Sequence, residues 1–71
     1  MTLKEAIDIG RACGATTIGE VAGLIAKFYS EYRITELFPT EDSWEQWCDE
    51  YENWRDHYEE TFSLAFEDCK I

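Results

Sequence analysis

Residues 40–69 read TEDSWEQWCDEYENWRDHYEETFSLAFEDC and decide the fold that this chain is expected to adopt. The stretch has no Gly or Pro, and acids crowd its first turn, where the helix dipole favours negative charge. Its apolar side chains recur at spacings of three and four, the period of an amphipathic helix. They are Trp44, Trp47, Cys48, Tyr51, Trp54, Tyr58, Phe62, Ala65, Phe66 and Cys69. The pattern predicts a helix that begins at Thr40 or Asp42 and continues for about 27 residues, roughly 40 Å.

This apolar stripe is longer than two short helices can cover easily. Two alternatives follow: the helix breaks near residues 61–63 and folds back, or its exposed part packs against a second copy of the chain. Aromatic side chains at helical spacing are usually core residues, and we assign four of them to the core: Trp47, Tyr51, Trp54 and Tyr58. Trp44 is expected to be partly exposed.

Two shorter helices are predicted upstream of this stretch. Thr2 and Glu5 have the spacing of a capping box, and the helix that follows is expected to end at Gly14. Thr17 and Glu20 repeat the capping pattern before a second apolar period. The chain is therefore expected to be one all-α domain, residues 1–71, with a short helical hairpin followed by a long, acidic and aromatic-rich C-terminal helix.

The second helix is expected to run to about Tyr32 and carries two glycines on one side, Gly19 and Gly23. Because glycine has no Cβ, another backbone can approach closely there, and we expect the first or third helix to cross at this point. The single proline follows Phe38 and disfavours helix at that residue. It marks the hinge before the third helix, with Leu37 and Phe38 expected in the core.

The negative charge of the protein is concentrated in the third helix and the residues after it. From Glu41 to Asp68 there are eleven acids and one base, Arg55, which gives a local charge equal to the net charge of −10 for the whole chain. Hydrophobic residues make up 45% of the sequence, so a folded protein is expected despite this charge. Such segregation causes self-repulsion in the compact state and favours a basic partner.

Five of these acids have the spacing that places them along one side of a helix, and we call them the acidic ladder: Glu45, Asp49, Glu52, Asp56 and Glu59. Successive members lie roughly 4.5 to 6 Å apart along the helix axis. Duplex DNA presents one charge per about 1.7 Å over both strands, so the ladder is a candidate mimic of a phosphate row. Trp44 is a candidate aromatic anchor beside it. The alternative is that the acids only solvate the helix, although ordinary helix surfaces mix both signs of charge.

Catalytic and metal-binding motifs are not found in the sequence. Cys13, Cys48 and Cys69 have no CxxC spacing and occupy apolar helical positions, where a thiol is inert. His57 has no HExxH partner, and there is no DxDxDG loop or GxSxG motif. We expect no enzyme activity, no cofactor and no metal.

Direct binding to nucleic acid or to a membrane is not expected either. Only Arg11, Lys27 and Arg33 are available to meet phosphate near the first two helices, and Glu20 occupies a position where a helix-turn-helix needs an apolar contact. No apolar run approaches the roughly 20 residues that cross a bilayer. Three reduced cysteines and no signal peptide favour the cytoplasm.

The segments TLKEAIDIGRACG, residues 2–14, and TIGE, residues 17–20, resemble the start of small uncharacterised proteins from phages and mobile elements of Firmicutes. They cover about a quarter of the chain. The size and acidity are similar to those of anti-CRISPR and other anti-defence proteins, several of which imitate nucleic acid. This resemblance implies a binding inhibitor in the host cytoplasm and carries over no functional residues.

Two functional hypotheses remain open. The first is a non-catalytic inhibitor that presents the acidic ladder to a basic nucleic-acid-binding host protein, for example a CRISPR effector. The second is a helical protein–protein interaction or homo-oligomeric assembly module, such as a homodimer, in which an aromatic seam pairs two copies and the acids only solvate the outside.

Overall fold

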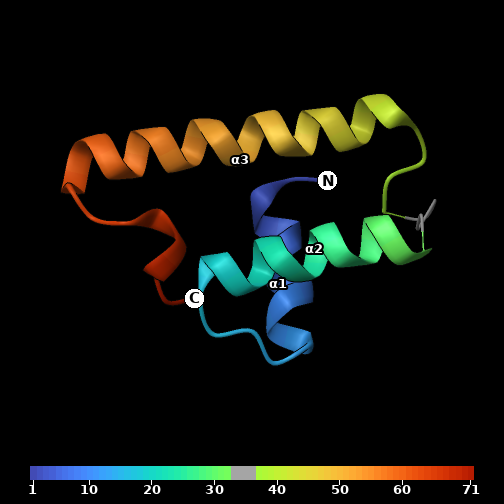
Figure 1. Cartoon of the computed structure of the whole chain (residues 1–71), viewed down its shortest axis with the longest axis horizontal. Helices are drawn as coiled ribbons and strands as arrows, with labels where there is room; N and C mark the ends of the chain where they lie inside the picture. Colours follow the sequence, from blue (N-terminus) through green and yellow to red (C-terminus); the bar gives the residue numbers. More distant parts are fainter. Residues whose placement is uncertain (33–36) are drawn as a thin grey trace.

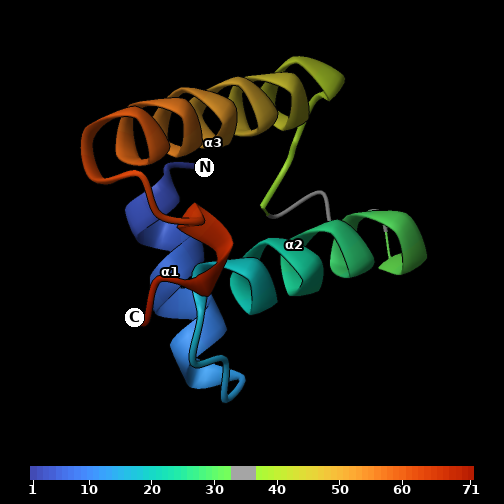
Figure 2. The same ribbon diagram turned by 60° about the vertical axis from the view of Figure 1, so that its left-hand side comes forward.

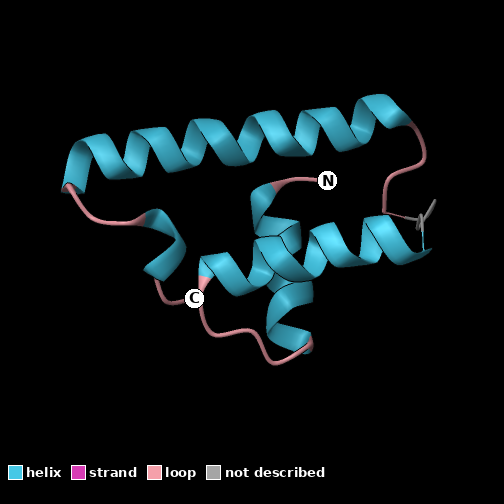
Figure 3. Cartoon of the chain, viewed as in Figure 1, coloured by secondary structure: helices cyan, strands magenta, loops and turns pink. Residues whose placement is uncertain are grey.

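The computed structural model describes residues 1–32 and 37–71 of the chain. Segment 33–36, which contains Arg33, lies outside the described residues. The described chain contains three α-helices and a short 3₁₀ helix, and Figure 3 shows that no strand accompanies them. The elements are α1 (Leu3–Ala12), α2 (Ile18–Tyr32), α3 (Glu41–Phe62) and η1 (Phe66–Asp68). The predicted all-α class is confirmed.

Helices α1 and α2 begin where the sequence predicts, because each has a threonine that caps it. The Glu5 backbone N–H donates to Thr2 Oγ1 at 3.2 Å, and the Glu20 backbone N–H donates to Thr17 Oγ1 at the same distance. Each bond satisfies one of the N–H groups that the first helical turn leaves without a partner. After α1 the chain turns through Gly14, whose φ of +87° is a conformation that favours glycine.

Helix α3 begins at a reciprocal capping box and ends earlier than predicted. Thr40 Oγ1 accepts from the Ser43 N–H, and Ser43 Oγ accepts from the Thr40 N–H, both at 3.2 Å. The helix continues for 22 residues to Phe62, where Ser63 adopts the left-handed conformation with φ 54°. The chain then folds back, and Phe66 of η1 reaches the core with 4% of its surface exposed. Of the two alternatives for the long apolar stripe, the structure has the break at residues 61–63.

The helices are arranged as an antiparallel pair crossed by a third. Figures 1 and 2 show α2 and α3 running in opposite directions, with α1 crossing α2 at a steep angle and its N-terminal end directed toward α3. The C-terminal segment returns from α3 to the start of α2, where Thr17 and Lys70 form an antiparallel bridge. This bridge and η1 close the side of the molecule on which α3 ends.

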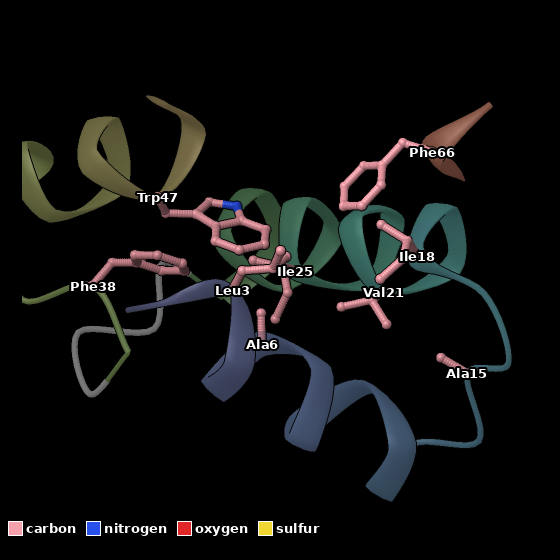
Figure 4. Packing of buried hydrophobic residues seen from close by; sticks show 9 residues of the cluster. All are labelled: Leu3, Ala6, Ala15, Ile18, Val21, Ile25, Phe38, Trp47 and Phe66. Carbon is pink, nitrogen blue, oxygen red and sulfur yellow. The ribbon is translucent and has the colours of Figure 1, made fainter. Parts of the chain in front are cut away.

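A single cluster of buried side chains joins all four elements (Figure 4). Its members are Leu3, Ala6, Ala15, Ile18, Val21, Ile25, Phe38, Trp47 and Phe66. Trp47 is the buried residue of α3 and points toward Leu3 of α1 and Ile25 of α2. Phe38 is buried and Leu37 is partly buried, so the predicted packing of the hinge is confirmed. The position of Trp47 sets the orientation of α3 about its own axis.

The helices cross at a different glycine from those predicted. A Cβ on Gly10 of α1 would lie 2.6 Å from Val21 Cγ2, so the contact of α1 with α2 needs a glycine there. A Cβ on Gly19 would instead lie 3.1 Å from the Glu67 carbonyl oxygen in the returning segment, and Gly23 faces open space. Another backbone therefore does approach closely at Gly19, but the expectation that α1 or α3 crosses at Gly19 and Gly23 is wrong. Their spacing identifies a side of α2, but it does not determine which element covers that side.

Candidate functional site

The acidic ladder occupies the side of α3 that faces away from the core. All five members are exposed. At 3.6 residues per turn, Asp56 lies opposite the buried Trp47, and the other four members lie within about 60° of Asp56 around the helix. They are Glu45, Asp49, Glu52 and Glu59. Since α3 is one continuous helix of 22 residues, these carboxylates form a row on a straight support.

Three more acids of α3 lie on the same side and are exposed: Glu41, Asp42 and Glu60. The described residues contain one ion pair, Arg55 Nε to Asp56 Oδ1 at 3.4 Å, and the Asp56 side chain remains 70% exposed in it. An exposed pair of this kind contributes little stability and is screened by salt. The outer side of α3 therefore keeps nearly all of its negative charge.

One ladder member also has a role in the fold. Glu59 Oε1 accepts a hydrogen bond from the Phe66 backbone N–H at 3.3 Å, which ties the end of α3 to η1. With Asp56 paired to Arg55 and Glu59 bonded to the Phe66 backbone, the ladder carboxylates with no hydrogen bond or ion pair in residues 1–32 and 37–71 are Glu45, Asp49 and Glu52. These three are the best candidates for contact with another molecule.

The thiol of Cys48 reports the combined charge of these three carboxylates. Burial raises the pKa of Cys48, and the negative charges of Glu52, Asp49 and Glu45 raise the same pKa further. Each carboxylate disfavours the thiolate because like charges repel. Three ladder residues from successive turns thus act on one group, which agrees with a concentrated negative field along this part of α3.

Trp44 is partly exposed, as predicted, and part of its surface is used by the fold. Its ring stacks on Tyr29 of α2, with centroids 4.1 Å apart and planes 2° from parallel. Phe38 meets the same indole edge-on, at 5.1 Å and 87°. One face of Trp44 is therefore covered from within the protein.

Trp54 was predicted to be a core residue, and this prediction is wrong because 51% of its surface is exposed. Its spacing from Trp47 places it on nearly the same side of α3, two turns further along. Because α1 crosses steeply, it covers only a short length of α3 (Figure 2). Tyr51 and Tyr58 are partly buried, since both rings pack on Phe66. Trp54 has no such cover and borders an open cleft between α1 and α3.

Two further apolar side chains are exposed at the corner where α3 ends, Phe62 at 57% and Leu64 at 61%. The sequence pattern includes Phe62 in the apolar stripe, because the period alone does not indicate where the helix stops. Leu64 lies outside the spacing of that stripe. This mismatch of spacing is a signal in the sequence that Leu64 does not belong to the core.

The thiols and the histidine are not gathered into a site. Cys13 is exposed at the C-cap of α1, and Cys69 is partly buried after η1, so the expectation of apolar helical positions is wrong for these two. Both lie just beyond a helix, where the apolar period no longer applies. His57 is on the surface.

No protein-family model matches this chain, and no curated protein or solved structure is significantly similar to it. Among residues 1–32 and 37–71, none of the helices has the length and apolar character needed to cross a membrane.

Proposed function

We propose that this protein is a non-catalytic inhibitor from a phage or mobile element. In this proposal the outer side of α3 binds a basic nucleic-acid-binding protein of the host, for example a CRISPR effector, as a mimic of nucleic acid in the host cytoplasm. The observation that supports it is the row of exposed carboxylates on one side of a straight helix, neutralised at only one point in the described chain.

The spacing of charge on α3 is close to that of one nucleic-acid strand. Eight acids face outward between Glu41 and Glu60, which is roughly one carboxylate per 4 Å of helix axis. A DNA strand has one phosphate per 3.4 Å. The whole helix is about 33 Å long, close to one turn of duplex DNA. A groove lined by Lys and Arg that binds one nucleic-acid strand would therefore meet carboxylates at nearly the spacing of phosphates.

The fold keeps this row in place without a partner. At one end α3 is held by the stacking of Trp44 on Tyr29, and at the other by Phe66, whose ring contacts Tyr51 and Tyr58. A helix held at both ends presents its charges without a large ordering cost on binding. The proposed partner contacts are the ladder residues, with the partly exposed Trp44 beside the first of them.

Affinity capture from a nuclease-treated host lysate tests the proposal. The test variant replaces the three unpartnered ladder acids by amides: Glu45→Gln, Asp49→Asn and Glu52→Gln. A matched control removes the same charge elsewhere on the surface, outside the ladder: Glu5→Gln, Glu31→Gln and Asp68→Asn. The wild type and the control should retain a basic protein at low salt and release it at high salt, because salt screens exposed charge pairs. Equal retention by the ladder variant would reject the proposal.

The second hypothesis drawn from the sequence is an assembly module, and it needs an aromatic seam along α3 that pairs two copies. In the structure Trp47 and Tyr51 pack on residues of the same chain, with Trp47 buried to 3% exposure. The Trp47 ring is therefore already covered in the monomer, and the Tyr51 ring is covered in part. A contact between copies has to use other residues of α3.

A further inference from the structure

The cleft beside Trp54 is a concave surface on the side of α3 that faces α1. Its volume is about 340 Å³, and it lies between the exposed side of α1 and the middle of α3. Ile7 of α1 and Trp54 of α3 supply apolar lining to it. Trp54 also lines a second shallow hollow, together with Asn53 and His57. Trp54, with 51% of its surface exposed, therefore borders two hollows.

The charges around this cleft differ from those of the outer side of α3. Lys4 and Arg11 of α1 line it together with Asp8 and Glu50, so the charged residues are two of each sign. A basic protein would meet two cations here, and nucleic acid would meet two anions. A surface that carries both signs allows a copy rotated about a two-fold axis to place cations opposite anions, which a surface of one sign does not.

We propose that two copies of this chain form a two-fold symmetric dimer through this cleft. Each Trp54 enters the cleft of the other copy, so an exposed indole and a cleft on the same surface match reciprocally. A tryptophan buries about 150 to 250 Å² and is the residue type most enriched among binding hot spots. The acidic ladder lies on the far side of α3, and the dimer carries two such rows facing outward.

The charge of the chain predicts how this dimer responds to salt. Each copy has a net charge of −10, and the repulsion between two copies is long-range. Salt screens this repulsion and also the charge pairs across the cleft, but the repulsion between two net charges of −10 is the larger of the two effects. Burial of the Trp54 indole does not depend on ions. Added salt therefore strengthens the dimer, whereas it weakens binding of a basic partner to the ladder. The dimer and the binding of a basic partner can therefore be rejected independently of each other.

Sedimentation equilibrium of the purified protein tests the dimer, at concentrations from roughly 10 μM to 1 mM. The wild type should show a monomer–dimer equilibrium that shifts toward dimer between roughly 0.05 and 0.5 M salt. Trp54→Ala should weaken the dimer at least about tenfold. Phe62→Ala is the matched control, because Phe62 is an equally exposed aromatic of α3 outside the cleft. It should leave the equilibrium unchanged.

A pair of charge reversals provides the second arm of the test. Lys4→Glu makes the cleft predominantly negative and should shift the protein to monomer. Lys27→Glu makes the same change in net charge on α2, outside this cleft, and should have a much smaller effect. A wild type that stays monomeric at every concentration and salt would overturn the proposal. So would a Trp54→Ala variant that dimerises as the wild type does, or equal effects of Lys4→Glu and Lys27→Glu.

Discussion

Tyr29 of α2 and Trp44 of α3 stack face to face, with ring centroids 4.1 Å apart and planes 2° from parallel. Phe38, from the segment between the two helices, meets both rings edge-on, at 5.7 Å from Tyr29 and 5.1 Å from Trp44. These arrangements are the favoured geometries for aromatic pairs. The three rings fasten the start of α3 to the end of α2 and so fix the direction in which the acidic ladder points.

This stack should make a measurable contribution to stability. Trp44→Ala should lower the free energy of unfolding by about 2 kcal/mol, because the ring is partly rather than fully buried. A double-mutant cycle with Tyr29→Ala should give a coupling energy of about 0.5 to 1.5 kcal/mol. Denaturant unfolding followed by circular dichroism measures the free energy of unfolding of the wild type, the two single variants and the double variant. If the double variant loses the sum of what the two single variants lose in free energy of unfolding, the two rings do not stabilise each other.

The close contact of α1 with α2 predicts opposite effects of two glycine replacements. Gly10→Ala should destabilise the protein by roughly 1 to 3 kcal/mol, since the new Cβ meets the buried side chain of Val21. Gly23→Ala should stabilise it by about 0.5 to 1 kcal/mol, because the added methyl has open space and alanine favours helix. Thermal unfolding of both variants is the measurement. Equal effects would show that α1 and α2 do not cross at Gly10.

Tyr51 has a buried hydroxyl oxygen with no hydrogen-bond partner in the described residues. An unsatisfied buried hydroxyl carries a desolvation penalty, so Tyr51→Phe should stabilise the protein by about 1 kcal/mol at neutral pH. Tyr58→Phe is a contrasting control because, in the described residues, the hydroxyl of Tyr58 is not a buried group left without a partner. Tyr58→Phe should not increase the free energy of unfolding. A loss of stability in Tyr51→Phe would show that the hydroxyl is hydrogen-bonded in solution.

The same residue predicts the direction of a pH effect. Burial raises the pKa of Tyr51, and the negative charge of Glu67 raises it further. The unfolded chain therefore loses this proton first as the pH rises past about 10, and the free energy of unfolding falls with increasing pH. Tyr51→Phe should show a shallower fall above that pH. Parallel curves for wild type and variant would mean that the pKa of Tyr51 is the same in the folded and unfolded states.

Cys48 offers a direct probe of the field from the ladder. In a Cys13→Ser, Cys69→Ser background, alkylation by the neutral reagent iodoacetamide as a function of pH reports the pKa of Cys48. The triple amide variant at Glu45, Asp49 and Glu52 should have a lower Cys48 pKa than its parent, because three like charges are removed. Salt should lower the pKa in the parent more than in the variant. Identical titrations would mean that the carboxylates do not act together on this side of α3.

The parts of the fold that depend on neighbours in the sequence could be predicted from it. Thr2 and Thr17 cap their helices by bonds to residues three positions away, and these contacts form whatever the rest of the chain does. The exposure of the ladder follows in the same way, because helical period places its members opposite Trp47. The caps could be predicted from residues three positions apart, and the exposure of the ladder from helical period and one buried residue, Trp47.

The parts that depend on how helices meet could not be predicted in this way. The apolar period places Trp54 on the inner side of α3, but only the crossing angle of α1 determines whether anything covers it. The end of α3 at Phe62 depends on a left-handed Ser63, a conformation for which glycine is the usual signal. The bond from the Phe66 N–H to Glu59 depends on that return and has no signature in the sequence.

Competition with nucleic acid tests the central claim most directly. The measurement is the fluorescence anisotropy of a labelled duplex bound to the captured basic protein, titrated with wild type, with the Glu45, Asp49 and Glu52 amide variant, and with its matched control. We predict that the wild type and the control displace the duplex and that the ladder variant does so at least about tenfold less well. A stable ternary complex of protein, partner and duplex, or equal displacement by the ladder variant, would contradict mimicry by α3.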